Sequence, residues 1–143
     1  MPKAKLLIFF DNLNFTEMNA LMNQVQLIGR LGADAEIKTT SQGARVSNFR
    51  IATNERLKMN NGQWRELTQW HSCVVWGDLT KIVERFGHKG NLFMISGALQ
   101  YHEYTDVHGI KRNVAEIKVS QILVLDSSRS GIPSDVEEQE EAI

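Results

Sequence analysis

The stretch of the chain that decides the fold is QWHSCVVWGDL, residues 69–79. Its apolar run is rich in β-branched and aromatic residues, which favour a strand. Side chains alternate between the two faces of a strand, so Trp70 and Trp76 share one face, while Cys73 and Val75 share the other. A tryptophan on a strand is more often buried than exposed. Here the two smaller apolar residues suit the interior better, so we expect both tryptophans on the open face.

Strand signals continue on both sides of this stretch. The predicted strands are residues 25–40 (bending at Gly29 and Gly32), 44–53, 63–76, 92–104 and 111–125. A strong hairpin signal, Asn60-Asn61-Gly62, joins the second and third of them. Phe49, Phe86 and Phe93 are expected in the core.

One helix is predicted between the third and fourth strands. Asp78 is a suitable N-cap, and Gly87 suits the end of the helix. Between them, apolar residues follow at helical spacing, namely Leu79, Ile82, Val83 and Phe86. This order predicts a mainly β fold, a five-stranded Greek-key barrel of the oligonucleotide-binding (OB) type. A sandwich would require about seven strands, and a doubly wound fold would require repeated strand–helix alternation.

Charge divides the 143 residues into three parts. Residues 1–21 are neutral and form an N-terminal extension of uncertain structure. Residues 22–125 form the predicted domain and hold 13 Lys and Arg against nine Asp and Glu, a net charge of +4. Residues 126–143 carry a net charge of −5 and are expected to form a disordered acidic tail. A basic domain can attract a polyanion, and an acidic tail can compete with that polyanion or recruit a basic partner.

Composition also limits the cellular setting. The apolar run at residues 6–10 is too short to span a bilayer, so we expect no membrane segment. Cys73 is the single cysteine, which rules out an internal disulfide and fits a reducing compartment. We expect it to be buried rather than reactive.

Catalytic patterns are lacking in the sequence. The four histidines have no zinc-ligand spacing, and one cysteine cannot build a thiolate site. The sequence has no glycine-rich phosphate loop and no G-x-S-x-G elbow. Asp34 and Glu36 share a face, but nothing joins them into a nuclease site. We therefore predict no catalytic residue, no metal and no cofactor.

Aromatic and basic residues are interleaved instead, a pattern typical of proteins that bind single-stranded nucleic acid. The aromatic candidates are Trp64, Trp70, Trp76, Tyr101 and Tyr104. The basic residues among them are Arg30, Lys38, Arg45, Arg50, Arg56, Lys58, Arg65, Lys81, Lys89, Lys111 and Arg112. Those on the predicted helix can equally form a solvated face. Base stacking on an aromatic ring contributes about 1–3 kcal/mol per base and needs no particular sequence.

Several blocks of the sequence together resemble the bacterial single-stranded DNA-binding proteins. These blocks are NQVQLIGRLGAD (23–34), VSNFRIATNE (46–55), WHSCVVWGDL (70–79), Lys89-Gly90 and Gly97-Ala98-Leu99. They occur in the family's order and cover about residues 22–125. The resemblance implies an OB barrel, a homotetramer, and sequence-independent binding of single-stranded DNA in replication, recombination and repair.

The resemblance also implies roles for individual residues. Trp70 matches a stacking tryptophan, Trp76 an aromatic position, and Tyr104 a position that is often tryptophan. Leu57 stands where the family often has a tryptophan, so Trp64 on the same hairpin is expected to compensate. His71 matches a histidine at a subunit contact. The full set predicted to bind DNA is Trp70, Trp76, Tyr104, Trp64, Arg30, Arg50, Arg56, Lys58, Lys81 and Arg112.

The tail departs from the family pattern, because it is acidic but does not end in Ile-Pro-Phe. Replication and repair proteins remain candidate partners through this tail. The expected location is the cytoplasm, in association with the nucleoid. The alternative interpretation is an OB-fold protein-interaction module of the primosome type.

Overall fold

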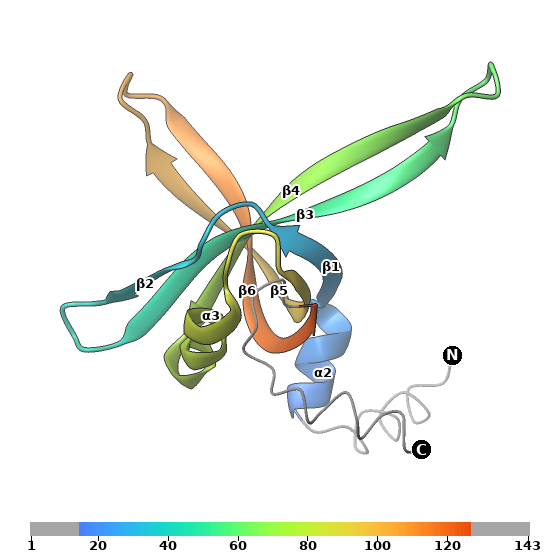
Figure 1. Cartoon of the computed structure of the whole chain (residues 1–143). Coiled ribbons are helices and arrows are strands. Elements are labelled where there is room, and N and C mark those ends of the chain that lie inside the picture. The colour runs from blue at the N-terminus through green and yellow to red at the C-terminus, as the bar shows by residue number, and fades with distance from the viewer. Residues whose placement is uncertain (1–14, 127–143) are drawn as a thin grey trace, which may run out of the picture.

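The computed structural model describes residues 15–126. Two helices, one 3-10 turn and six strands follow one another in this part of the chain (Figure 1). In order they are α2 (Phe15–Met22), β1 (Val25–Leu31), β2 (Glu36–Thr39), β3 (Arg45–Lys58), β4 (Trp64–Trp76), η1 (Gly77–Leu79), α3 (Thr80–Phe86), β5 (Leu92–Thr105) and β6 (Lys111–Asp126).

Five of the strands close into a barrel. The sheet runs β1-β5-β6-β4-β3-β2, and an additional pairing of β1 with β3 closes the barrel, with β2 paired to β3 outside the closed ring. The strands pair antiparallel except where β4 meets β6, at Cys73 opposite Ile117 and Val74 opposite Lys118. This closure confirms the predicted OB-type barrel. The predicted first strand is interrupted between Leu31 and Glu36, and its second part, β2, pairs with β3.

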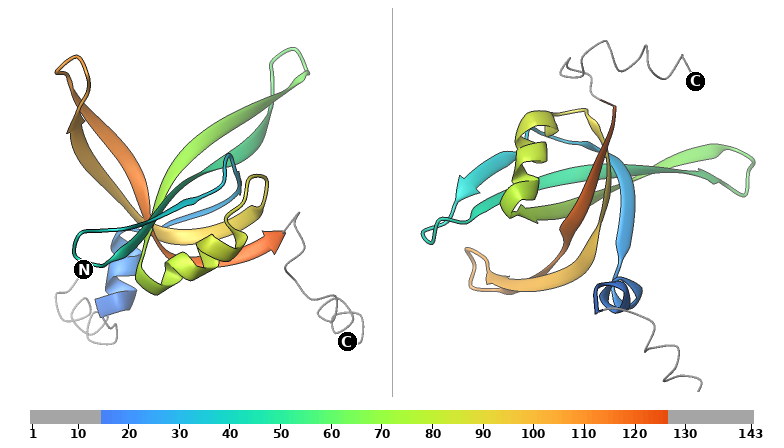
Figure 2. Two further views of the ribbon diagram at one scale, coloured as in Figure 1. Left: turned by 60° about the vertical axis from the view of Figure 1, so that its left-hand side comes forward. Right: turned by 90° about the horizontal axis from the view of Figure 1, so that it is seen from below.

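Two long hairpins extend from the barrel as arms (Figures 1 and 2). The β3–β4 arm turns at residues 59–63, and the β5–β6 arm turns at residues 106–110. β3 continues to Lys58, beyond the predicted end at Thr53, because its outer half pairs with β4 as far as Lys58 opposite Trp64. Hydrogen bonds between the strands hold these outer parts together, although nearly all their side chains are exposed.

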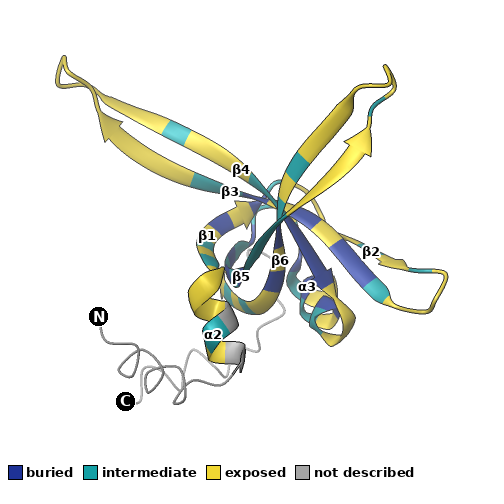
Figure 3. Ribbon diagram, turned by 180° about the vertical axis from the view of Figure 1, so that it is seen from behind, coloured by how far each residue is buried: buried dark blue, intermediate teal, exposed yellow. Residues whose placement is uncertain are grey.

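The core lies inside the barrel, while the arms are largely exposed (Figure 3). Phe49 and Phe93 meet edge to face, with ring centroids 5.9 Å apart, and Phe86 packs against the buried cluster. These positions confirm the core expected for the three phenylalanines. The buried cluster comprises Leu31, Phe49, Ile51, Cys73, Val75, Val83, Phe93, Ile95, Ile117 and Val119.

The helix between β4 and β5 begins differently from the prediction. Asp78 is not its N-cap, because Gly77 has a φ of +71° and the chain first makes the 3-10 turn η1. The Thr80 hydroxyl donates a hydrogen bond of 2.6 Å to the Gly77 carbonyl. The helix does end at Gly87, as predicted, but with a φ of −79°. Glycine is needed there because a Cβ would overlap the Val83 carbonyl.

A part of each predicted flanking segment belongs to a helix or a strand. Residues 15–22 form α2, within the predicted N-terminal extension. At the other end Asp126, which the prediction assigns to the tail, is the last residue of β6 and pairs with Arg30 at 3.2 Å. The apolar run at residues 6–10 and the rest of the acidic tail lie outside the described residues.

Candidate nucleic-acid interface

Three tryptophans lie along one face of β4. Trp64, Trp70 and Trp76 are spaced six residues apart and are 59%, 50% and 46% exposed. Cys73 and Val75, on the opposite face, are buried, which confirms the predicted orientation of this strand. At a rise of about 3.3 Å per residue, neighbouring tryptophans are separated by about 20 Å along the strand. The sequence prediction missed that Trp64 shares this face, although its even spacing from Trp70 contains that information.

Cations lie over two of the three rings. The Arg50 guanidinium carbon is 5.5 Å from the Trp70 ring centroid. At Trp64, the Arg56 guanidinium carbon is 5.4 Å from the ring centroid and the Lys58 ammonium nitrogen is 6.0 Å from it. These distances are within the range of cation–π attraction. The site thus places positive charge directly on the aromatic surface.

Strand register explains these contacts. Trp64 is opposite Lys58, and Trp70 is opposite Ala52. In each case the arginine lies two residues before the opposing position on β3, which is the diagonal neighbour on the same face. Trp76 is opposite Val46, and the equivalent diagonal position is Ala44 rather than an arginine. Within residues 15–126, no cation lies over the Trp76 ring.

A cavity of about 320 Å³ opens beside Trp70. Trp70 and Arg50 line it together with residues of β3 and of the β1–β2 connection. The lining residues are Gly32, Ala33, Asp34, Glu36, Asn48, Phe49, Arg50 and Trp70. The surface around this tryptophan is therefore concave and mostly apolar, with one cationic side chain (Arg50) and two carboxylates (Asp34 and Glu36) in its lining.

The β5–β6 arm carries the two exposed tyrosines. Tyr101 and Tyr104 are three residues apart on β5 and point to opposite faces of the strand. Tyr104 is opposite Arg112 on β6. Arg112 donates through Nε to Asp106 at 3.0 Å, and the backbone N–H groups of His108 and Ile110 donate to the same carboxylate. The hydrogen bond from Ile110, followed by those from Arg112 and His108, lowers the pKa of Asp106.

The predicted basic residues fall into two groups. Arg50, Arg56 and Lys58 lie over tryptophan rings. Arg30, Lys81 and Arg112 are engaged by acidic residues, at 3.2 Å from Asp126, 3.6 Å from Asp78 and 3.0 Å from Asp106. Arg30 also donates to the Gly90 carbonyl. The first group is therefore the one that the fold gathers around the aromatic face.

Trp64 does not occupy the position of the tryptophan that the family often has where this chain has Leu57. Leu57 is opposite Arg65, whereas Trp64 is opposite Lys58. Adjacent residues on a strand face opposite sides, so Leu57 and Trp64 lie on different faces of the arm. Trp64 extends the row formed by Trp70 and Trp76 and does not restore a ring at position 57.

His71 and Cys73 lie on the face of β4 opposite to the three tryptophans. His71 Nε2 and Thr53 Oγ1 are 2.8 Å apart, a hydrogen bond across the β3–β4 pair. Burial lowers the pKa of His71 and raises the pKa of the Cys73 thiol to about 12. The thiol is therefore protonated at neutral pH and packs as a small apolar group, in line with its expected burial.

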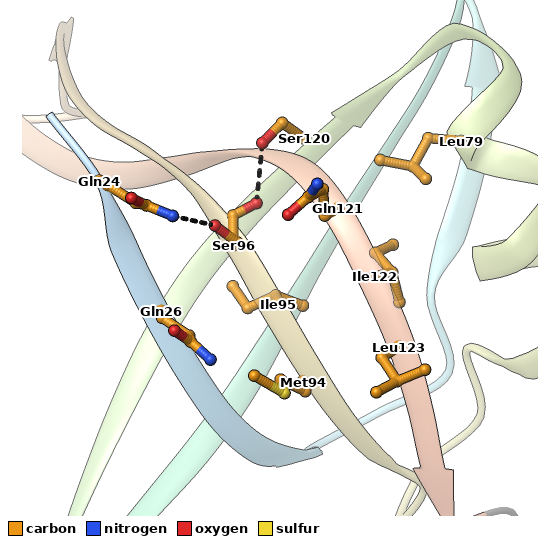
Figure 4. A pocket seen from close by; sticks show the side chains of 10 residues that line it. All are labelled: Gln24, Gln26, Leu79, Met94, Ile95, Ser96, Ser120, Gln121, Ile122 and Leu123. Atoms are coloured by element: carbon orange, nitrogen blue, oxygen red, sulfur yellow. Dashed lines mark hydrogen bonds between the residues drawn. The ribbon is translucent and has the colours of Figure 1, made fainter. Parts of the chain in front are cut away.

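Outside this face, a cavity of about 570 Å³ lies over β1, β5 and β6 (Figure 4). Its lining residues are Gln24, Gln26, Leu79, Met94, Ile95, Ser96, Ser120, Gln121, Ile122 and Leu123. The Gln24 amide donates to Ser96 Oγ at 3.0 Å, and Ser120 Oγ donates to the Ser96 carbonyl at 3.2 Å. This lining contains no charged and no aromatic residue, so it lacks the groups that hold nucleic acid.

Residues 15–126 contain neither a metal-binding cluster nor a membrane-spanning helix. No group of three or more His, Cys, Asp or Glu side chains that could hold a metal ion occurs there. None of the helices in that range is both long enough and apolar enough to cross a membrane.

The aromatic row on an OB barrel agrees with comparisons to known proteins. The profile described as the single-strand binding protein family matches residues 22–125. The chain belongs to this family. The match covers the whole barrel and both arms, and it begins at the last residue of α2.

Curated relatives in the family come from diverse bacteria. Single-stranded DNA-binding protein 1 of Chlorobaculum tepidum is 38% identical over 111 residues, covering 77% of this chain and 68% of the relative. The single-stranded DNA-binding protein of Rhizobium meliloti is 41% identical over 102 residues, covering 70% and 59%.

A solved structure with a similar fold is the Plasmodium falciparum SSB complex with ssDNA. It aligns with a TM-score of 0.68 and 27% identity, over 73% of this chain and 95% of that chain. The family assignment and the OB fold are thus supported by sequence and by structure.

Proposed function

We propose that this chain binds single-stranded DNA without regard to sequence, by stacking bases on the β4 tryptophans while nearby Arg and Lys side chains contact phosphates. The observation that carries the proposal is the row of Trp64, Trp70 and Trp76, all exposed on one face, with cations at two of the rings. Stacking suits this purpose because every base has a flat π face. Tyr104 on the second arm adds a further ring.

Family membership supports the same ligand. The Plasmodium falciparum relative was solved in complex with single-stranded DNA, and the curated relatives carry that activity in their names. The roles in replication, recombination and repair follow from the family in the same way. We extend the proposal to a cytoplasmic, nucleoid-associated protein without catalytic activity, metal or cofactor.

Assembly into a homotetramer is part of the proposal. The cavity over β1, β5 and β6 is lined by apolar and uncharged polar side chains, a composition suited to a protein–protein contact. None of the three β4 tryptophans lines this cavity, so the residues of the proposed subunit contact and of the stacking surface are different. We place His71 at a subunit contact, and the acidic tail in the recruitment of replication and repair proteins, on the family resemblance.

The proposal is tested by competition between DNA forms. A labelled dT oligonucleotide bound by the full chain should be displaced by unlabelled single strands of mixed sequence, and far less well by a duplex of the same sequence. Binding should weaken with salt, with a log–log slope of about −0.7 per neutralised phosphate. Equal competition by duplex and single strand, or no binding at low salt, would favour the protein-interaction module instead.

A further inference from the structure

Base stacking requires an open ring face, and two of the three tryptophans in the row have a face occupied by a cation. Arg50 lies 5.5 Å from the Trp70 centroid, and Arg56 lies 5.4 Å from the Trp64 centroid. A guanidinium and a base cannot occupy the same face of one indole at the same time. A base that stacks on the face covered by the arginine must therefore displace the guanidinium.

Neither arginine is held elsewhere. Over residues 15–126, no salt bridge involves Arg50 or Arg56, in contrast to Arg30, Lys81 and Arg112. A cation–π contact at an exposed site is weak, whereas a guanidinium–phosphate pair is a charge-assisted and often bidentate hydrogen bond. A phosphate brought close to the ring offers each of these arginines a better partner than the ring does.

We propose that Arg50 and Arg56 are exchangeable caps on the stacking rings. In the free protein each guanidinium covers an indole face. When a nucleotide arrives, the base takes that face and the guanidinium moves to the phosphodiester of the same strand. The two arginines are positioning residues that couple stacking to phosphate neutralisation at Trp64 and Trp70. This inference rests on the proposed function and adds the regulation of its stacking sites.

The third tryptophan provides the contrast within the same row. Trp76 faces Val46, with Ala44 at the diagonal position where the other rings have arginine. Stacking on Trp76 thus involves no exchange with a cation. Salt should therefore affect the three subsites unequally, since exchange delivers a cation to a phosphate only at Trp64 and Trp70.

The test uses variants that keep a single tryptophan. In the parent protein for this test, Trp64→Phe and Trp76→Phe leave Trp70 as the single source of tryptophan fluorescence. Arg50→Lys and Arg50→Gln are then made in this parent and compared with it. Three quantities are measured: quenching of the free protein by acrylamide, quenching by a dT oligonucleotide, and the salt dependence of affinity.

Acrylamide should quench Trp70 more strongly in the free Arg50→Gln protein than in its parent, because the ring loses its cover. This difference should vanish in the DNA complexes. Arg50→Gln should also reduce the salt slope by about 0.7, which is about a fivefold smaller loss of affinity over a tenfold rise in salt. Arg50→Lys should keep the parent's slope.

Two controls isolate the cap. Arg65→Gln removes an arginine from the other face of the same arm and should leave acrylamide access to Trp70 unchanged. In a protein that keeps Trp76 as its single tryptophan, Arg50→Gln should leave the quenching of Trp76 by acrylamide unchanged.

One result would overturn the exchange. If DNA quenches Trp70 but Arg50→Gln leaves the salt slope unaltered, Arg50 stays on the ring and the base stacks elsewhere on it. That result leaves the proposed function standing. If DNA fails to quench Trp70 in every variant although binding persists, stacking at Trp70 itself is wrong.

Discussion

Gly32 lies directly against the indole of Trp70. A Cβ placed on Gly32 would be 2.5 Å from Cζ3 and 2.7 Å from Cη2 of that ring, closer than any real contact allows. Gly32, which directly follows β1, therefore limits how closely the Trp70 ring can approach the barrel. Because glycine has no Cβ, the Trp70 ring can occupy its present position.

Replacing this glycine should move the ring without unfolding the protein. Gly32→Ala forces the Trp70 ring to shift from its present position, so we expect a loss of DNA affinity of up to about 1–3 kcal/mol, the contribution of one stacked base. The measurement is oligonucleotide affinity together with the thermal midpoint. In a Trp70→Ala background, Gly32→Ala should have no further effect on affinity; a full additional loss there would contradict the account.

Trp64 should matter more for long strands than for short ones. It lies about 20 Å from Trp70 along β4, a distance that a stacked strand rising about 3.4 Å per nucleotide spans with about six nucleotides. Trp64→Ala should therefore weaken binding of long oligonucleotides by about 1–3 kcal/mol, with a smaller effect when the oligonucleotide is too short to reach both rings. Leu57→Ala, on the opposite face of the arm, is the matched control. A loss independent of oligonucleotide length would be the contrary result.

The basic residues should differ in their contribution to the salt dependence. Arg56 lies over Trp64 and has no acidic partner among the described residues, whereas Asp106 accepts from Nε of Arg112. Arg56→Gln should reduce the log–log slope by about 0.7, and Arg112→Gln should reduce it less. Affinity measured at several salt concentrations decides this. If Arg112→Gln has the larger effect, the second arm rather than the first follows the phosphates.

Stability should depend on pH through His71. Burial lowers the pKa of His71 below its ordinary value of 6.5, so the unfolded chain takes up the proton first as the pH falls. The stabilisation linked to the neutral His71 side chain should therefore be fully present above pH 6.5. As the pH falls from 6.5 toward the folded-state pKa, the free energy of unfolding should decrease.

Urea unfolding at fixed protein concentration, at about pH 7.5 and about pH 5.5, tests this dependence. His71→Gln keeps a side chain able to hydrogen-bond Thr53 but removes the titrating group. The native protein should lose more stability on acidification than this variant. Identical pH dependence in the two proteins would exclude His71 as the source.

The fold was predictable because its signals are local. Alternation at Cys73 and Val75, the turn at Asn60-Asn61-Gly62 and the single apolar helix each depend on neighbouring residues. The turn also sets the register of β3 against β4, in which Lys58 faces Trp64 and Val46 faces Trp76. The diagonal arginines could therefore have been located by counting back from the hairpin.

Other features depend on contacts distant in sequence. Arg30 and Asp126 are 96 residues apart, and nothing near either residue indicates that they pair. The outer half of β3 also escaped the prediction, because beyond Thr53 this strand has no buried face to impose alternation; the predicted bounds of the other three arm strands agree with the structure to within one residue. The helix start was misjudged because the positive φ of Gly77 inserts a 3-10 turn before it.

The central claim is that exposed tryptophans of β4 stack bases, and Trp70 tests it most directly. The measurement is the affinity of Trp70→Ala and Trp70→Phe for a dT oligonucleotide at low salt, alongside their thermal midpoints. We predict that Trp70→Ala weakens binding by about 1–3 kcal/mol, that Trp70→Phe recovers most of the loss, and that neither variant unfolds. Unchanged affinity in a folded Trp70→Ala protein would contradict the account.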